Sequence, residues 1–145
     1  MRVLVQRVIS SSVEVDSKVV GAIDKGLLLL VGFTAGDTSK EIDYMVDKVI
    51  NLRIFDDENG VMNKSLLDIN GSILSISQFT LYADASKGRR PSYINALGGS
   101  KAVLLYEEFN KKLRDTGIHI ETGVFGADMK VSLINDGPVT IMLEK

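Results

Sequence analysis

Gly26-Leu27-Leu28-Leu29-Leu30-Val31-Gly32-Phe33 is a continuous apolar run with a glycine at its first and seventh positions. A strand with one face in water alternates apolar and polar side chains, whereas a strand buried on both faces shows no alternation. This run therefore predicts a central strand that is packed on both sides. The other elements of the chain are expected to be arranged around it.

On either side of this run, alternating segments predict further strands. Arg2–Ile9 alternates, and Ser12–Val15 and Lys18–Ile23 flank the turn signal Asp16-Ser17. Met129–Leu143 alternates too, and reads as two strands joined by a turn at Asn135-Asp136-Gly137-Pro138, where Gly and Pro impose an unusual backbone. Shorter extended segments are expected at Arg53–Phe55, at Ser65–Ile69, within Gly71–Leu81 and at Ile118–Glu121.

Two segments have the apolar spacing of amphipathic helices. The first runs from about Lys40 to Leu52 and follows the capping residues Asp37-Thr38-Ser39. The second runs from Ser100 to about Thr116 and ends before Gly117. Together these elements predict an α/β fold in a β-rich single domain over residues 1–145. Mixed, largely antiparallel sheets would form a barrel-like core, with two main helices outside it.

The composition narrows the class of protein. The 145 residues are 45% hydrophobic and 25% charged, which is the balance of one ordinary soluble domain. No apolar run is long enough to span a bilayer, and the N-terminal residues read as a strand and not as a signal peptide. The absence of cysteine excludes disulfides and thiolate catalysis, and the net charge of −2 gives no overall attraction for nucleic acid.

Motifs of the common catalytic and metal centres are absent. The chain has no HExxH, Walker A, GxGxxG or GxSxG pattern. Its one histidine, His119, lies between two isoleucines, where a structural or exposed role is usual. Asp56–Gly60 lacks the spacing and the closing glutamate of a calcium loop and reads as a solvated turn. We therefore expect no metal site.

Two basic clusters are present, one in a loop and one on the second predicted helix. Each could be a solvated surface, and each could contact the phosphates of a nucleic acid. Composition alone does not decide between these interpretations. The loop cluster consists of Lys87, Arg89 and Arg90, and the helix cluster consists of Lys111, Lys112 and Arg114.

Four segments, taken in order, carry a resemblance to a known family. They are Met1–Val8 (MRVLVQRV), Ser77–Leu81 (SQFTL), Lys87–Tyr93 (KGRRPSY) and Asn135–Thr140 (NDGPVT). In combination they resemble the D-aminoacyl-tRNA deacylases, and the match runs through nearly the whole chain with no additional domain. The departures are minor: a tyrosine closes the third segment where phenylalanine is commoner, and the serines at 10–12 replace a segment that often contains alanine.

The resemblance implies an activity. These enzymes hydrolyse the ester that joins a D-amino acid to tRNA, act also on certain glycyl-tRNAs, and reject L-aminoacyl substrates. They are cytoplasmic homodimers with active sites at the subunit interface, they bind the 3′ end of aminoacylated tRNA, and they need no metal or organic cofactor. We therefore expect a chiral proofreading enzyme with no membrane partner.

The resemblance also implies catalytic roles for four consecutive residues. Ser77, Gln78, Phe79 and Thr80 match the motif that lines the pocket for the aminoacyl ester. Backbone N–H groups around Phe79 would hold the carbonyl oxygen, as in an oxyanion hole. Two proton-transfer routes are possible, one through the 2′-hydroxyl of the terminal adenosine and one through Thr80 as a nucleophile. We favour the first, because a threonine hydroxyl needs an activating base and the sequence offers none.

Chiral selection is implied for a second group of residues. Gly137 and Pro138 match a motif that in this family carries a cis peptide and enters the active site of the partner subunit. Arg7 matches the residue that braces this dipeptide, and Met129 lies in the matching segment near the pocket. For tRNA, the loop cluster is the better candidate, because a glycine lets the loop follow a nucleic-acid backbone; its members are Lys87, Arg89 and Arg90.

Two other functional classes stay open. A non-catalytic RNA-binding module would be favoured if basic residues clustered on one surface and the pocket were closed. A conventional Ser/Thr esterase would require His119 to approach Thr80 or Ser77. The position of this histidine in the fold is therefore informative.

Overall fold

The computed structural model describes residues 1–145 as one α/β domain, as the sequence predicts. No helix combines the length and the apolar composition needed to cross a lipid bilayer. In chain order, the elements are β1 (Arg2–Val15), β2 (Lys18–Ile23), β3 (Gly26–Gly32), α1 (Ser39–Asn51), β4 (Phe55–Asp56), β5 (Met62–Lys64), β6 (Ser72–Ser77), the 3₁₀ helix η1 (Phe79–Tyr82), α2 (Gly99–Asp115), β7 (Ile120–Thr122) and β8 (Lys130–Glu144).

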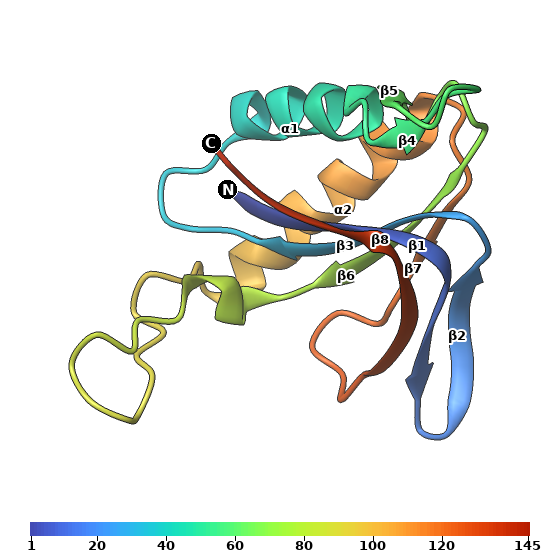
Figure 1. The fold of residues 1–145 in the computed structure, drawn as a ribbon. Helices are drawn as coiled ribbons and strands as arrows, with labels where there is room; N and C mark the ends of the chain where they lie inside the picture. Colours follow the sequence, from blue (N-terminus) through green and yellow to red (C-terminus); the bar gives the residue numbers. More distant parts are fainter.

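Six strands form one mixed sheet with the order β2-β1-β3-β6-β7, and β8 pairs with β1. The pairs within β1, β2, β3 and β8 are antiparallel, whereas β3–β6 and β6–β7 are parallel. The sheet curves strongly (Figure 1) until β2 meets β7, where a Cβ added to Gly21 would lie 2.8 Å from the carbonyl oxygen of Thr122. The result is a nearly closed barrel, which confirms the predicted fold class.

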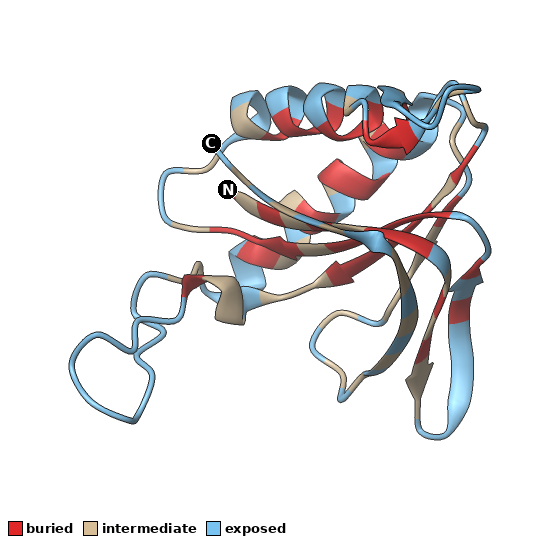
Figure 2. Ribbon diagram, viewed as in Figure 1, coloured by how far each residue is buried: buried red, intermediate tan, exposed pale blue.

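The central strand β3 is packed on both faces, as its uninterrupted apolar sequence predicts. Leu27, Leu29 and Val31 belong to a large cluster of 21 buried residues between the sheet and the helices. Leu28 points the other way, into a cluster of 6 buried residues inside the curve of the sheet. Figure 2 shows this buried strip along the middle of the sheet, with exposed residues on the outer strands.

Both helices cover the same face of the sheet. The buried side of α1 includes Ile42, Met45 and Val49, which join the larger cluster together with Tyr106 and Phe109 of α2. The start of α1 is fixed by a capping box, in which Thr38 and the side chain of the third helical residue exchange hydrogen bonds. The predicted helices are therefore present, within one or two residues of their expected ends.

The C-terminal segment differs from the predicted hairpin. β8 is one 15-residue strand that pairs with β1 along its length and bulges outward at Asp136–Val139. Gln6 is paired with Thr140 and Val8 with Asn135, so four residues of β8 stand opposite Arg7 alone. The side-chain amide of Asn135 closes the bulge by donating to the carbonyl oxygens of Arg7 at 2.8 Å and Val139 at 3.1 Å. A tertiary partner strand thus turns an apparent turn sequence into a bulge.

Three other predicted segments also differ from the elements in the structure. The two segments expected at Arg2–Ile9 and Ser12–Val15 form the single strand β1, because β1 pairs first with β3 and then with β2 along the same edge. Ser65–Ile69 is a turn and not an extended segment, and its backbone is held by the carboxylate of Asp68, which accepts from the N–H of Ser65 at 2.8 Å.

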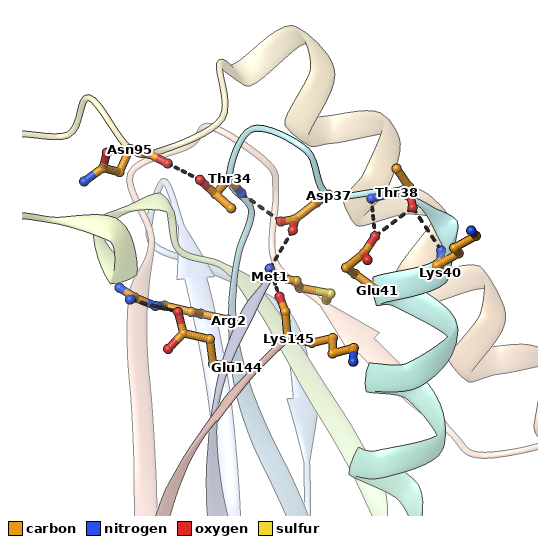
Figure 3. A network of polar contacts seen from close by, with 10 residues as sticks. All are labelled: Met1, Arg2, Thr34, Asp37, Thr38, Lys40, Glu41, Asn95, Glu144 and Lys145. Carbon is orange, nitrogen blue, oxygen red and sulfur yellow. Dashed lines mark hydrogen bonds and ion pairs between the residues drawn. The ribbon is translucent and has the colours of Figure 1, made fainter.

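A polar network joins the two chain ends to the loop before α1 (Figure 3). The α-ammonium group of Met1 donates to the carboxylate of Asp37 and to the carbonyl oxygen of Lys145, both at 2.6 Å. The same carboxylate accepts from the N–H of Thr34 at 2.8 Å, and the hydroxyl of Thr34 donates to the carbonyl oxygen of Asn95 at 2.6 Å. The network therefore links β1, β8 and two loops beside the cavity described next.

Candidate active site

A cavity of about 640 Å³ opens beside the end of β6. The ends of β3 and β6, the start of η1, the start of α2 and the segment between β7 and β8 form its wall. Most of the lining is apolar, and this part includes Val31, Phe33, Ile76, Ala102, Phe125 and Met129. A concave, mostly apolar cavity with few polar groups at its mouth is the usual form of a small-molecule site.

The predicted catalytic segment lies at this cavity. Ser77, Gln78 and Phe79 line it, whereas Thr80 is not among the lining residues. Parallel pairing places the segment, because Ser77 is opposite Val31 and the N–H of Gln78 donates to the carbonyl oxygen of Val31 at 2.7 Å. The strand ends at Ser77, and Phe79 begins the 3₁₀ turn η1. The motif therefore spans a strand end and the turn that follows it.

Backbone N–H groups are available at this turn. The first N–H groups of a helical turn have no acceptor within the turn. Around η1, turn hydrogen bonds are donated by Leu81 to Gln78 and by Ala83 to Thr80, no side chain caps the turn, and the N–H groups of Phe79 and Thr80 stand at its start, ahead of the first acceptor in it. These two N–H groups can therefore donate to a bound oxygen atom, which is the chemistry expected of an oxyanion hole.

The side chains of this segment supply no base. The amide nitrogen of Gln78 donates a hydrogen bond to the hydroxyl oxygen of Thr80. An amide donor does not remove a proton from a hydroxyl group, so this contact orients Thr80 without activating it. No lining residue carries a carboxylate, imidazole, ammonium or guanidinium group.

His119 lies outside the site. It does not line the cavity, its side chain is 63% exposed, and its Nε2 is 3.1 Å from the carboxylate of Glu121. The approach to Ser77 or Thr80 that a conventional Ser/Thr esterase requires is therefore absent. Two phenols nearby are equally unsuited to act as bases, because burial raises the pKa of Tyr106, and burial raises that of Tyr82 to about 12.

Gly137 and Pro138 occupy the bulge of β8 and are exposed. They do not line the cavity of their own chain. The guanidinium group of Arg7 lies directly against Gly137, so a side chain at this position would collide with it. Gly137 also has a φ of +102°, which favours glycine. The structure thus places Arg7 under the dipeptide, as a bracing role requires.

The peptide bond of this dipeptide differs from the cis form that the family resemblance implies. The chain contains no cis peptide bond, so the bond between Gly137 and Pro138 is trans. The trans form is the ordinary preference of an X–Pro bond. In the single chain both residues of the dipeptide are exposed, and the trans form is the one present there.

Arg7 is held by four groups. Its Nε donates to the carbonyl oxygen of Asp136 at 3.2 Å and lies 3.2 Å from the carboxylate of the same residue. Its Nη1 donates to the carbonyl oxygen of Ile54 at 2.5 Å and lies 3.6 Å from the carboxylate of Asp56. Side-chain burial and these contacts fix the guanidinium plane, and with it the position of the bulge.

The two basic clusters differ in their surroundings. Lys111 and Lys112 on α2 pair with Asp115 and with Asp43 and Glu108, so much of their charge is compensated. The loop cluster is exposed and takes part in none of the ion pairs of the structure; its members are Lys87, Arg89 and Arg90. The loop is therefore the stronger candidate for a phosphate contact.

Several residues of the site were not predicted from the sequence. Ala102 and Phe125 complete the apolar wall, yet they come from α2 and from a loop after β7. Tyr93 stands at the cavity mouth with its ring 5.1 Å from that of Phe79. Its place in the third resembling segment was the only signal for Tyr93, and no pattern in the sequence indicated that Ala102 or Phe125 belongs to the site.

Comparison with known proteins supports one family. A family model described as D-Tyr-tRNA(Tyr) deacylase matches residues 4–144. Proteins named D-aminoacyl-tRNA deacylase from Clostridium tetani and from the Langeland strain of Clostridium botulinum are 60% and 58% identical over 144 residues, which cover 99% of this chain and 97% of each relative.

Two solved structures have the same fold. A structure titled "c-Myc DNA Unwinding Element Binding Protein" has a TM-score of 0.94 and 42% identity, and the match covers 100% of this chain and 99% of that one. A structure titled as a probable eukaryotic D-amino acid tRNA deacylase has a TM-score of 0.84 at 19% identity, with coverage of 98% and 97%. The full-length family match and the close relatives show that this chain belongs to the D-Tyr-tRNA(Tyr) deacylase family.

Proposed function

We propose that this protein hydrolyses the ester bond of D-aminoacyl-tRNA and releases a free D-amino acid and tRNA. It rejects L-aminoacyl-tRNA and retains activity on some glycyl-tRNA, and it works in the cytoplasm. The observation that carries this proposal is the apolar cavity with the Ser77–Phe79 segment at its mouth and no carboxylate, imidazole or amine in its wall. Family membership and the names of the close relatives point the same way.

Catalysis in this proposal uses backbone groups and the substrate itself. The N–H groups of Phe79 and Thr80 donate to the ester carbonyl oxygen as negative charge develops on it. The 2′-hydroxyl of the terminal adenosine, which is adjacent to the ester, assists the attack of water. An aminoacyl ester is already activated, so this modest stabilisation is sufficient. Thr80 is held by Gln78 and forms no acyl intermediate.

Chiral selection comes from a second copy of the chain. We propose a homodimer in which the Gly137–Pro138 segment of each copy reaches the cavity of the other. The dipeptide is exposed and braced by Arg7, so its carbonyl groups are rigid and free to contact a ligand. They accept from the α-ammonium group of the substrate and occupy the space of an L side chain. Glycine has no side chain to exclude, so glycyl-tRNA is cleaved.

The surface around β8 is suited to such an interface. β8 pairs only with β1, so its other edge is unpaired, and none of its residues is buried. Ile134 and Met142 are exposed on this strand, and Ile9 is exposed on β1 beside it. An unpaired edge with exposed apolar side chains is a common site of association.

Deacylation of one tRNA charged with D-tyrosine, L-tyrosine or glycine tests the proposal. We expect rapid release of D-tyrosine, slower release of glycine and no release of L-tyrosine above the uncatalysed rate. Equal release of both enantiomers would contradict chiral selection. Binding of tRNA without any hydrolysis would show an RNA-binding module instead. Light scattering on the same sample tests the dimer, which a fully active monomer would refute.

A further inference from the structure

An exposed aromatic pair stands at the mouth of the cavity. Phe79 is 55% exposed and Tyr93 is 42% exposed, although large aromatic side chains are usually buried. Their ring centres are 5.1 Å apart with an angle of 67° between the planes, so the two rings hold each other in an edge-to-face arrangement. The next residue, Ile94, is 86% exposed. The rim of the cavity therefore presents a fixed apolar surface to solvent.

The basic loop is anchored to this rim. The N–H and carbonyl groups of Asp84 and Ser92 pair with each other through two hydrogen bonds of 2.8 Å, which close the loop from Ala85 to Pro91. Tyr93 follows this bridge directly, so the aromatic ring and the cations of the loop are part of one structural unit. Three cations in this loop have no acidic partner, although the chain as a whole has a net charge of −2; they are Lys87, Arg89 and Arg90.

From this arrangement we infer that the rim is a binding site for single-stranded RNA, which holds the nucleotides that precede the terminal aminoacyl-adenosine. The base next to the terminal adenosine stacks on Tyr93, and the phosphates of these nucleotides contact Arg89 and Arg90. This inference rests on the proposed function, because the reacting ester defines which end of the RNA enters the cavity. The enzyme would then recognise several nucleotides of the single-stranded RNA end and not only the terminal nucleoside.

The chemistry of the rim favours RNA over an apolar partner. Proteins that bind single strands combine exposed aromatic rings with a groove of basic side chains, because every base has a stacking face and every nucleotide carries a negative charge. A hydrophobic protein partner would gain nothing from three uncompensated cations.

Substrates of increasing length test the inference on the unaltered enzyme. D-tyrosine would be esterified to adenosine, to the dinucleotide CA and to the trinucleotide CCA. We expect kcat/KM to rise at least about fivefold from adenosine to CA, since a stacked base contributes on that scale. The salt dependence should also steepen by about 0.7 in logarithmic slope for each phosphate that is contacted.

Substitutions at the rim test whether its residues cause the rise in kcat/KM and the steeper salt dependence. Tyr93→Ala should bring the ratio of kcat/KM between CA and adenosine close to one, whereas Tyr93→Phe should preserve it because the ring remains. Arg89→Gln/Arg90→Gln should flatten the salt dependence of the CCA substrate. Lys111→Gln/Arg114→Gln removes the same charge from α2 and should leave the salt dependence unchanged. Each variant is compared with itself on adenosine, so a general loss of activity does not affect the ratio.

Two results would overturn the inference. The first is a wild-type enzyme that cleaves D-tyrosyl-adenosine as efficiently as the CA and CCA substrates. The second is a ratio that stays high in Tyr93→Ala while the melting temperature shows a folded protein. Both results leave the proposed function intact, because D-tyrosine is still released. Failure to cleave any D-tyrosyl substrate, full-length tRNA included, would instead refute the proposed function.

Discussion

Among single residues, Arg7 has the most restricted environment. It is the only basic residue that the fold buries, and its guanidinium group contacts the bulge of β8 and the segment between α1 and β4. A buried charge is tolerated only when it is paired and hydrogen-bonded, and both conditions are met through Asp136, Asp56 and the carbonyl oxygen of Ile54. Arg7 thus stabilises the fold and positions the dipeptide proposed to select the substrate.

Replacement of this side chain should therefore be costly. Arg7→Met keeps much of the volume but leaves two carboxylates and a buried carbonyl oxygen without their donor. We expect the free energy of unfolding to fall by about 3 kcal/mol, measured by urea denaturation. Arg114→Met, at an exposed position without an ion pair, serves as control and should change stability by less than about 0.5 kcal/mol. Equal effects of the two substitutions would contradict the bracing role.

Among the elements, α1 depends on a local signal that the sequence displays. The hydroxyl of Thr38 accepts from the N–H of Lys40 at 3.3 Å, and the carboxylate of Glu41 accepts from the N–H of Thr38 at 2.8 Å. Thr38→Ala should lower the free energy of unfolding by about 1 kcal/mol. Ser100→Ala removes a hydroxyl from the first turn of α2, whose N-terminus has no side-chain capping hydrogen bond, and should be nearly neutral in the same urea measurement.

The capping box also predicts a pH dependence. The hydrogen bond from the Thr38 hydroxyl lowers the pKa of Glu41 below its ordinary value of 4.5. A carboxylate whose pKa is depressed by folding contributes stability above the unfolded pKa and loses it as the pH falls through the folded value. The stability difference between the wild type and Glu41→Gln should therefore be present at pH 7 and shrink below about pH 4.5. A difference that grows on acidification would contradict this assignment.

The elements also show how far local sequence could predict this fold. β3 and both helices follow from runs, spacing and caps that lie within each segment. The shape of β8 does not follow from its own sequence. Asn135–Pro138 has the composition of a turn, and it forms a bulge because it pairs around Arg7 of β1, which is far away in the sequence. Likewise the Ser77–Thr80 segment was found by its motif, whereas Phe125 reaches the cavity only because the barrel closes.

At the scale of the whole molecule, the ends of the chain meet beside the candidate site. The carboxylate of Asp37 has a side-chain exposure of 5% and pairs with the fully buried α-ammonium group of Met1. It also holds the N–H of Thr34, whose hydroxyl contacts the loop that contains Asn95. The same carboxylate thus connects the sheet to the loops that form one wall of the cavity.

Loss of this charge should affect the entire domain. Asp37→Asn keeps the shape of the side chain but leaves the buried ammonium group without a counter-charge, so the free energy of unfolding should fall by about 3 kcal/mol. The exposed Asp115→Asn, which removes the partner of Lys111 on α2, should cost less than about 1 kcal/mol. A melting curve of each variant checks this, and a neutral Asp37→Asn would show that the network does not stabilise the fold.

The cavity has no carboxylate, imidazole or amine in its wall, and we propose that catalysis relies on backbone N–H groups and on the 2′-hydroxyl of the substrate. Single-turnover hydrolysis of D-tyrosyl-tRNA tests this proposal. Two substrates are compared, one with a 2′-hydroxyl and one with a 2′-hydrogen on the terminal adenosine, and each is given to the wild-type enzyme and to Thr80→Val. We predict a loss of at least about a hundredfold on the deoxy substrate, typical of a missing general acid–base group, and less than about tenfold for Thr80→Val. Full activity on the deoxy substrate together with an inactive Thr80→Val enzyme would contradict the account.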